Sequence, residues 1–335
     1  MFGLGDPPVV AAARAQVTQA EAAAILSEQK LVFTVVSDFI NAASLRQQAE
    51  NYDRLLDIAR RQLDIVNAQL KLGHKLPQDA EVIQAEVGAL ESAASAVRQS
   101  ADAFAADLEA VSRGADLRGQ DEGVVIDNDV PPIAPLPPMG QFLDQVMPEH
   151  PALRVERTKI AMARDQLRVD QANGWPDLNL TTSFGSAQDF TYFSGNNGHV
   201  RPTGFESYLT LNIPLYDFGG RQAAVDESSE TLAAEKEGLR GADLEIRSSI
   251  TQAYGEILQG SAKVATLDSQ LARDTANLEL VKARNAQGEA DELTLLGAEM
   301  APLQDTLAIE NAELAQRLTY AELQNLAGGN WHWAP

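Results

Sequence analysis

The sequence of 335 residues contains no cysteine. This absence excludes disulfide bonds, thiol catalysis, cysteine zinc sites and lipid attachment at an N-terminal cysteine for these residues. No run approaches the roughly eighteen consecutive apolar residues that a transmembrane helix needs. Positive charge is scarce, with 26 Lys and Arg against 48 Asp and Glu and a net charge of −22. Nucleic acid and anionic lipid headgroups are therefore not expected as partners.

Residue patterns of catalysis are also missing. We find no Gly-rich phosphate loop, no GxSxG elbow and no HExxH motif, so we predict no enzymatic activity and no cofactor. The histidines, His74, His150, His199 and His332, lack companions at metal-ligand spacing, so no metal site is expected. The triplet 127–129 lacks the glycine and distal glutamate of an EF-hand loop and is interpreted as a solvated linker.

Two regions, about 7–113 and 220–327, are rich in Ala, Glu, Gln and Leu and carry heptad patterns. In the second region one apolar series recurs every seven residues: Ile250, Ile257, Val264, Leu271 and Leu278. A companion series lies three or four residues away: Leu232, Leu239, Ile246, Ala253 and Leu267. Such spacing predicts helices that pack as coiled coils.

The same series recurs 215 residues earlier, as Val35, Ala42, Ala49, Leu56 and Leu63. At the same offset Phe39 corresponds to Tyr254, and Gly73 corresponds to Gly288. Generic heptads would align by chance at some offset, but the shared aromatic and glycine positions favour a tandem duplication.

Each repeat is predicted to be a helical hairpin. A first helix of about 65 residues, roughly 100 Å long, ends at KLGHKLPQ in one repeat and at NAQGEADE in the other. A second helix returns over about 79–113 and 290–327. Ala85 and Ala298 correspond at an offset of only 213, so the first tip carries two extra residues, around Leu76 and Pro77.

Between the repeats, residues 114–139 are rich in Gly, Asp and Pro and predict a connector without helix. A short helix over 141–147 and a longer one from 151 to about 173 follow, and a Gly-Trp-Pro sequence ends the latter.

Period-two alternation then predicts two antiparallel strands, about 177–188 and 205–216, of the length that a tilted strand needs to cross a bilayer. Their apolar membrane residues are Leu178, Leu180, Phe184, Leu209, Leu211 and Ile213. A long polar loop joins the strands, and four aromatic residues lie near the strand ends, as in an interfacial girdle: Trp175, Phe190, Tyr192 and Phe205. A strand of a soluble sandwich could show the same alternation.

At the 215-residue offset, residues 216–220 correspond to residues 1–5. The first repeat thus begins where its own strand pair should have ended. We expect that a short helix, two strands and a signal sequence precede Met1 in the complete protein, because MFGLGDPPVV is not itself a signal peptide.

The predicted organisation has five parts. Residues 1–113 form the first helical hairpin, 114–150 the linker, and 151–216 a helix with the membrane strand pair. Residues 217–327 form the second hairpin and 328–335 a C-terminal tail.

The sequence resembles the TolC-like outer-membrane efflux protein family over essentially the whole chain. The features that carry the resemblance are HPALRVERTKIAMARDQLRVDQANGWPDLNL, LTLNIPLYDFGGR, the Tyr254 helix, the Gly288 tip and LQNLAGGNW. The resemblance implies a mainly α fold: tandem coiled-coil hairpins that form a periplasmic tunnel, with a small membrane β part. It also implies a homotrimer that shares one β-barrel in the lipid of a Gram-negative outer membrane. A periplasmic adaptor would meet the helix tips, and an inner-membrane RND or ABC pump would supply energy for efflux or type I secretion.

The sequence departs from that pattern in two ways. A trimer of two-stranded chains would have fewer strands than the smallest class of outer-membrane barrels, so either upstream residues are absent or this chain cannot form the pore. The family often places an aspartate six residues after the tip glycine, where this sequence has Asp79 in the first repeat but Thr294 in the second.

The candidate site residues lie at the two tips. Gly73, His74, Gly288 and Glu289 are candidates for adaptor contact, although the glycines could serve only as helix C-caps. An acidic gate is predicted from Asp79, Glu81, Asp291 and Glu292, although acids in a first helical turn also complement the helix dipole.

Two alternatives to the channel remain open: a soluble coiled-coil scaffold with a small β insertion, and a non-functional fragment of such a channel. Within the channel class, the cargo could be small toxic molecules, metal cations or a polypeptide.

Overall fold

The computed structural model describes residues 8–114, 133–172, 177–186, 203–213 and 216–329. Several residues named above lie outside these ranges: residues 1–5, 127–129, Trp175, Phe190, Tyr192, His199 and His332. The described residues belong to two compact units, one drawn from Met1–Ala22 and Arg154–Ala242, the other from Ala23–Leu153 and Asp243–Pro335. Each unit is described by itself.

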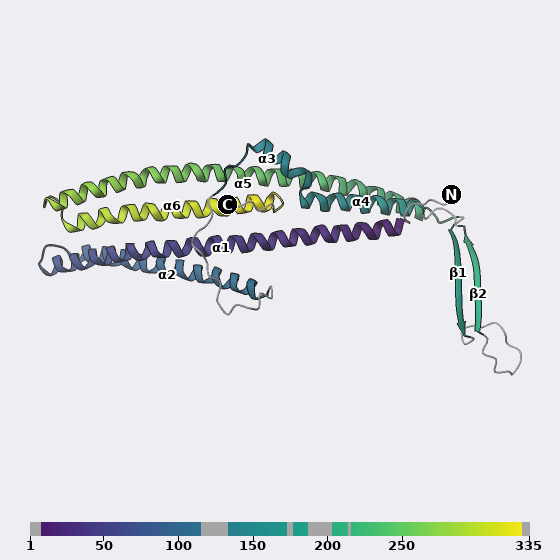
Figure 1. Cartoon of the computed structure of the whole chain (residues 1–335), viewed down its shortest axis with the longest axis horizontal. Coiled ribbons are helices and arrows are strands. Elements are labelled where there is room, and N and C mark those ends of the chain that lie inside the picture. The colour runs from purple at the N-terminus through teal and green to yellow at the C-terminus, as the bar shows by residue number, and fades with distance from the viewer. Residues whose placement is uncertain (1–7, 115–132, 173–176, 187–202, 214–215, 330–335) are drawn as a thin grey trace. The chain divides into compact units, whose positions relative to one another are not determined.

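Long helices dominate the chain (Figure 1). Helix α1 (Pro8–Lys71) is followed by α2 (Pro77–Gly114), and α5 (Gly220–Ala286) is followed by α6 (Glu292–Leu326). At 64 and 67 residues, α1 and α5 have nearly equal lengths. The predicted fold class, long helical hairpins with a small antiparallel sheet, is confirmed. Among the described residues, no helix is both long enough and apolar enough to cross a membrane.

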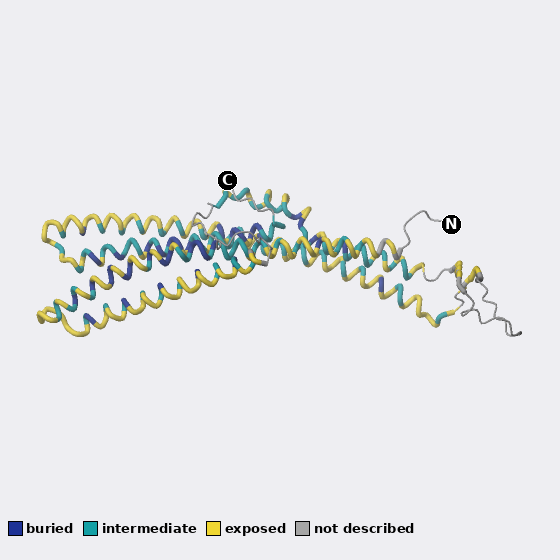
Figure 2. The backbone as a smooth tube through the Cα atoms, turned by 60° about the horizontal axis from the view of Figure 1, so that its bottom comes forward, coloured by how far each residue is buried: buried dark blue, intermediate teal, exposed yellow. Residues whose placement is uncertain are grey.

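The heptad positions lie on the packed faces of the helices. In α1, Ala42, Ala49 and Leu56 are buried, and in α5, Ile250 and Ile257 are buried. Figure 2 shows buried and exposed positions by colour along the helices. The exposed positions of both helices carry mostly charged, polar and alanine residues. An apolar stripe on an otherwise polar helix stabilises the fold only when another helix covers it and removes it from water. This explains why these helices pair along their length.

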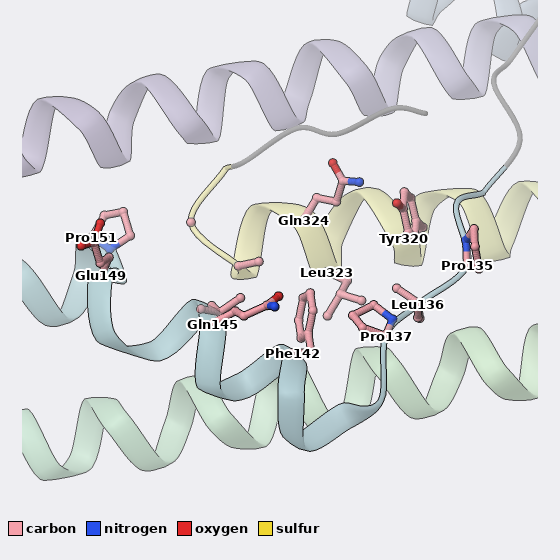
Figure 3. A pocket seen from close by; sticks show the side chains of 13 residues that line it. Pro135, Leu136, Pro137, Phe142, Gln145, Glu149, Pro151, Tyr320, Leu323 and Gln324 are labelled. Atoms are coloured by element: carbon pink, nitrogen blue, oxygen red, sulfur yellow. The ribbon is translucent and has the colours of Figure 1, made fainter. Parts of the chain in front are cut away.

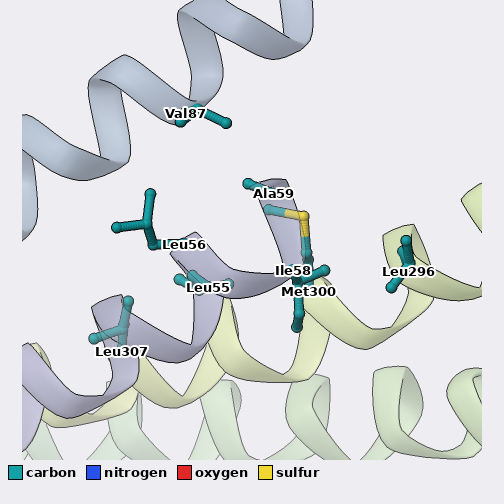
Figure 4. Packing of buried hydrophobic residues seen from close by; sticks show 8 residues of the cluster. All are labelled: Leu55, Leu56, Ile58, Ala59, Val87, Leu296, Met300 and Leu307. Atoms are coloured by element: carbon teal, nitrogen blue, oxygen red, sulfur yellow. The ribbon is translucent and has the colours of Figure 1, made fainter. Parts of the chain in front are cut away.

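The main core cluster joins three helices from both repeats (Figure 4). It contains Leu55, Leu56, Ile58 and Ala59 of α1, Val87 of α2, and Leu296, Met300 and Leu307 of α6. A second cluster repeats the arrangement further along, with Ile40, Ala42 and Ala43 of α1, Leu108 of α2 and Ala321 of α6. Helix α1 is therefore packed both on its hairpin partner and on a helix of the other repeat.

Polar side chains interrupt this core. Asn51 of α1 donates to Glu310 of α6 at 2.7 Å, and Gln270 of α5 donates to Asp305 of α6 at 2.7 Å. Burial raises the pKa of Glu310, and burial together with the neighbouring Asp274 carboxyl raises the pKa of Asp305. A displaced helix would leave these buried groups unpaired, so they favour one register of helix pairing.

The connector leads into short helices that dock on the long ones. Helix α3 (Met139–Val146) continues into the 3₁₀ turn η1 (Met147–Glu149), and α4 (Pro151–Ala172) follows. Pro151 occupies the first position of α4, where a missing N–H costs nothing. The Tyr254 hydroxyl, at the aromatic position shared by the two repeats, donates to the carbonyl oxygen of Pro137 at 2.9 Å. Its counterpart Phe39 instead packs against the second core cluster.

In the other unit, α4 lies against the first part of α5, where the Ser228 hydroxyl donates to Asp170. Strands β1 (Asp177–Ser186) and β2 (Thr203–Asn212) pair antiparallel as a two-stranded sheet. Strand β2 ends earlier than the sequence pattern predicts, and Ile213 lies one residue beyond it. Pro214 has no N–H to donate to a ladder, which is consistent with this earlier end.

Candidate functional site

The two hairpin tips have the same backbone geometry. Gly73 and Gly288 both have φ of 76°, in the left-handed region that favours glycine. The Gly73 N–H donates to Leu70 O at 3.0 Å and the His74 N–H to Gln69 O at 2.9 Å. At the second tip, Gly288 donates to Asn285 O at 2.9 Å and Glu289 to Arg284 O at 2.9 Å.

This pair of bonds is a Schellman motif, in which glycine at C′ ends the helix and satisfies its last carbonyl groups. The capping role of both glycines therefore has a direct structural basis. The space around both is open: a Cβ at either position would meet no atom of another segment within 4 Å. The backbone angle, and not crowding, is what requires glycine here.

Two of the predicted gate acids begin the returning helices. Asp291 is the N-cap of α6, where its carboxylate accepts from the Thr294 N–H at 2.9 Å. The Asp79 carboxylate accepts from the Leu76 N–H at 2.9 Å, which is one half of a capping box. The hydrogen bonds from Thr294 lower the pKa of Asp291, and the charge of Lys75 on the other tip lowers it further.

The other two acids, Glu81 and Glu292, are exposed in the first turns of α2 and α6. His74 and Glu289 are also exposed beside the tip glycines.

Sequence reasoning missed three exposed apolar side chains at the first tip. Leu72, Leu76 and Val82 are 72%, 64% and 66% exposed, which is unusual for large apolar side chains on a polar helical hairpin. The position that corresponds to Leu72 in the second repeat is Gln287. The two extra residues at the first tip include Leu76, and their apolar character was the signal available in the sequence.

One face of the strand pair is mainly apolar, with a single polar pair between its apolar pairs. Its cross-strand pairs are Leu178 with Leu211, Leu180 with Leu209, Thr182 with Ser207, and Phe184 with Phe205. The six apolar members of these pairs are between 58% and 79% exposed. A sheet face this apolar has no protein partner among the described residues, and hydrocarbon is the solvent that suits it.

A turn with an aromatic pair joins this sheet region to α5. Tyr216 and Phe218 are 75% and 90% exposed, and their rings meet edge to face at 4.7 Å. Phe218 has φ of 55°, which is uncommon for a large side chain. The Asp217 carboxylate accepts from the Arg221 N–H at 2.7 Å and fixes the start of α5, and these hydrogen bonds lower its pKa. Exposed aromatic side chains at the end of a lipid-compatible strand suit a membrane interface.

A strand pair with an exposed apolar face, joined in sequence to helices of this length, is typical of outer-membrane proteins that have a long helical extension. Comparisons with known proteins agree. The family model for the outer membrane efflux protein matches residues 142–329. The chain is 27% identical over 252 residues to Protein CyaE of Bordetella pertussis, a match that covers 73% of this chain and 51% of that protein. The chain thus spans about half the length of this relative.

Solved structures show the same fold. The CmeC outer membrane channel of Campylobacter jejuni matches with a TM-score of 0.73 and 12% identity over 97% of this chain and 68% of that one. The open state of the MtrE outer membrane channel of Neisseria gonorrhoeae matches with a TM-score of 0.71 and 18% identity over 96% of this chain and 72% of that one.

The chain belongs to the outer membrane efflux protein family. That membership confirms the resemblance found in the sequence and identifies the protein as a member of a non-enzymatic, outer-membrane channel family of Gram-negative bacteria.

Proposed function

We propose that the protein is one subunit of a homotrimeric export duct that conducts cargo passively and is gated at its periplasmic helix tips. The observation that carries this proposal is the exposed apolar face of β1 and β2, which suits lipid and not water. In hydrocarbon every backbone N–H and C=O needs a partner, and a two-stranded sheet leaves two outer edges. Other strands must therefore flank this pair, supplied by further copies or by residues outside this sequence.

The helices support assembly with further copies. Helix α1 is covered by both α2 and α6. Large apolar side chains nevertheless stay exposed on both long helices: Val17 and Leu31 on α1, at 59% and 52%, and Leu244, Leu258 and Leu280 on α5, at 68%, 55% and 51%. A neighbouring copy that covers these side chains would close a tunnel of hairpins around a central axis. The C3 symmetry of such a tunnel is the arrangement that the family resemblance implies.

The tips supply two chemically different surfaces. The exposed apolar side chains of Leu72, Leu76 and Val82, at the same tip as Gly73 and His74, would bind the periplasmic adaptor protein. The acidic side chains, Glu289 and Glu292 of the second tip together with Glu81 of the first, would face the duct. A ring of carboxylates from three copies would make the closed end selective for cations. Docking of the adaptor and of an inner-membrane RND or ABC pump would separate the tips and open the duct.

All four acids, Asp79, Glu81, Asp291 and Glu292, remain the proposed gate residues. Glu81 and Glu292 are chosen for the test because Asp79 and Asp291 also accept helix-capping hydrogen bonds, whose loss would change stability as well. The test is conductance of the purified protein in planar bilayers with unequal salt on the two sides. We expect Glu81→Gln with Glu292→Gln to reduce cation selectivity. The matched control is Glu245→Gln, an exposed position on α5 remote in sequence from the tips, and it should leave the reversal potential unchanged.

Two outcomes would contradict the proposal. Full recovery of the native protein in the soluble fraction without detergent would favour the coiled-coil scaffold. Incorporation into bilayers without any conductance, when the protein is produced from its complete native gene, would exclude the duct itself. Adaptor binding is tested separately, by capture of purified adaptor on wild-type protein and on Leu72→Ser with Leu76→Ser.

A further inference from the structure

A buried carboxyl group lies between the two helices of the second hairpin. Asp305 of α6 is 5% exposed, and its Oδ1 accepts from the Gln270 amide of α5 at 2.7 Å. Its Oδ2 is also buried and has no hydrogen-bond partner among the described residues. A buried, charged oxygen without a donor is unfavourable, so this atom requires an explanation.

A second carboxyl group beside Asp305 supplies one. Asp274 lies one helical turn from Gln270 on α5, and its side chain interacts with Asp305 through hydrogen bonding and charge. Carboxylates have only acceptor atoms, so two of them can form a hydrogen bond only when one holds a proton. Burial is the main cause that raises the pKa of Asp305, and Asp274 adds to it. Together they outweigh Gln270 and the charge of Arg273, which lower that pKa.

A proton, and not a metal ion, is the ligand that this pair suits. Two carboxyl groups and one amide leave a hard cation such as Ca²⁺ short of the six or more oxygen ligands that it takes. Within the part of the chain that the structure describes, no group of three or more His, Cys, Asp or Glu side chains is placed to hold a metal ion. A shared proton needs only two oxygens, and the burial of Asp305 favours the uncharged form.

The first hairpin has no such pair at the corresponding positions. At the 215-residue offset Asp274 corresponds to Ala59, and at the 213-residue offset of the returning helices Asp305 corresponds to Ser92. Ala59 is 0% exposed and belongs to the main core cluster. Only in the second hairpin do these two positions carry titratable side chains.

A proline weakens α6 beside the pair. Pro302 lies inside the helix, three residues from Asp305 on the side of the tip, and it has no N–H to donate to the carbonyl oxygen of residue 298. Its counterpart in α2 is Ala89. A helix bends most readily where a backbone hydrogen bond is missing, so α6 can change direction at Pro302.

We propose that Asp274 and Asp305 form a proton-binding pair that regulates the second hairpin. With one proton shared, the pair is a hydrogen bond that holds α6 against α5. Without the proton the two carboxylates repel each other, the helices separate at this level, and α6 bends at Pro302. Each transition moves one proton between the pair and solvent and changes no other bond. The regulation rests on the proposed function, because it makes the second tip easier to open as the pH rises, whereas the proton binding does not.

The cysteine-free sequence allows the separation of the two helices to be measured directly. Asn277→Cys on α5 and Gln304→Cys on α6 replace exposed residues and carry spin labels. The labelled full-length protein in detergent is diluted with unlabelled protein, so that double electron–electron resonance records distances within one chain. The measurement is repeated in buffers between pH 5 and pH 8.

We expect the long-distance population of the wild-type protein to grow several-fold as the pH rises. Asp305→Asn, whose amide donates at every pH, should keep the short distance throughout. The matched control is Asp268→Asn, which removes an exposed carboxylate of the same helix and should leave the pH response unchanged. Pro302→Ala should reduce the long-distance population at high pH without abolishing its dependence on pH.

A distance distribution that does not change with pH would overturn the proposal, and so would loss of the pH response in Asp268→Asn. A response to added Ca²⁺ at constant pH, reversed by a chelator, would also overturn it, because the ligand would then be a metal ion. Conductance in planar bilayers is recorded separately. A pH-dependent distance in a protein that conducts no ions would contradict the proposed export function and support the proton-binding pair.

Discussion

The imidazole Nε2 of His150 lies 2.6 Å from the backbone oxygen of Leu326. The other ring nitrogen, Nδ1, accepts from the Ala152 N–H at 3.2 Å, so the ring is neutral and its proton is on Nε2. One side chain thus caps the start of α4 and binds a terminal carbonyl of α6. Burial is the main cause that lowers the pKa of His150, and it outweighs the hydrogen bond to Leu326, which raises it.

This arrangement predicts a pH dependence. Because the folded-state pKa lies below the ordinary value of 6.5, the unfolded chain binds the proton more readily. The contribution of His150 to stability is complete above pH 6.5 and is lost as the pH falls below it. We expect His150→Gln to lower stability by about 1–3 kcal/mol at pH 7.5. The difference from wild type should shrink at pH 5.5, measured by thermal unfolding in detergent. A constant difference across this range would contradict a neutral, capping histidine.

Asp305 predicts the opposite response to pH. It is 5% exposed, accepts from Gln270 and has Asp274 beside it, and burial and that neighbour raise its pKa. A carboxyl with a raised pKa opposes folding above that pKa, and the opposition disappears as the pH falls below it. We expect Asp305→Asn to stabilise the protein at pH 7.5 by on the order of 1 kcal/mol, with a smaller gain at low pH. A loss of stability at pH 7.5 would show that the negative charge is needed.

The tip glycines predict equal costs in the two repeats. Gly73→Ala and Gly288→Ala should each destabilise the protein by about 1–2 kcal/mol, because alanine is disfavoured at the φ of 76° that both adopt. Gly88 supplies the control: it lies inside α2, where an alanine Cβ would meet no atom of a neighbouring helix within 4 Å. Gly88→Ala should stabilise by about 0.5–1 kcal/mol. Denaturant unfolding of the three variants in one buffer compares them. A loss at Gly88 as large as those at the tips would argue against the backbone explanation.

The two faces of the strand pair predict different tolerance to charge. Leu180→Arg on the apolar face should cost about 2–4 kcal/mol in a bilayer. Thr181→Arg, one residue away on the opposite face, should cost little, although both positions are exposed in the structure. The measurement is the fraction of protein that reaches the outer membrane and resists extraction with urea. Similar losses for both variants would mean that the apolar face does not meet lipid.

The sequence alone determined the fold class, because its signals are periodic. Ile250 and Ile257, with their counterparts Val35 and Ala42, set a heptad face, and Leu178 and Leu180 set a two-residue alternation. Periodic apolar residues require a particular secondary structure in order to lie on one face. The tip glycines could also be found in the sequence, because a sharp end to a long helix favours a residue that accepts positive φ.

The tertiary structure was needed to find the contacts between residues that lie far apart in the chain. No periodicity indicates that α6 packs on α1 of the other repeat, that His150 binds Leu326, or that a hollow opens beside Gly328 (Figure 3). The capping bonds of Asp79 and Asp291 likewise required the geometry, because the position of a carboxylate in a first helical turn does not by itself say which N–H groups it binds. Short-range patterns fix the local backbone, whereas contacts between distant segments depend on how whole helices are placed, which local patterns do not specify.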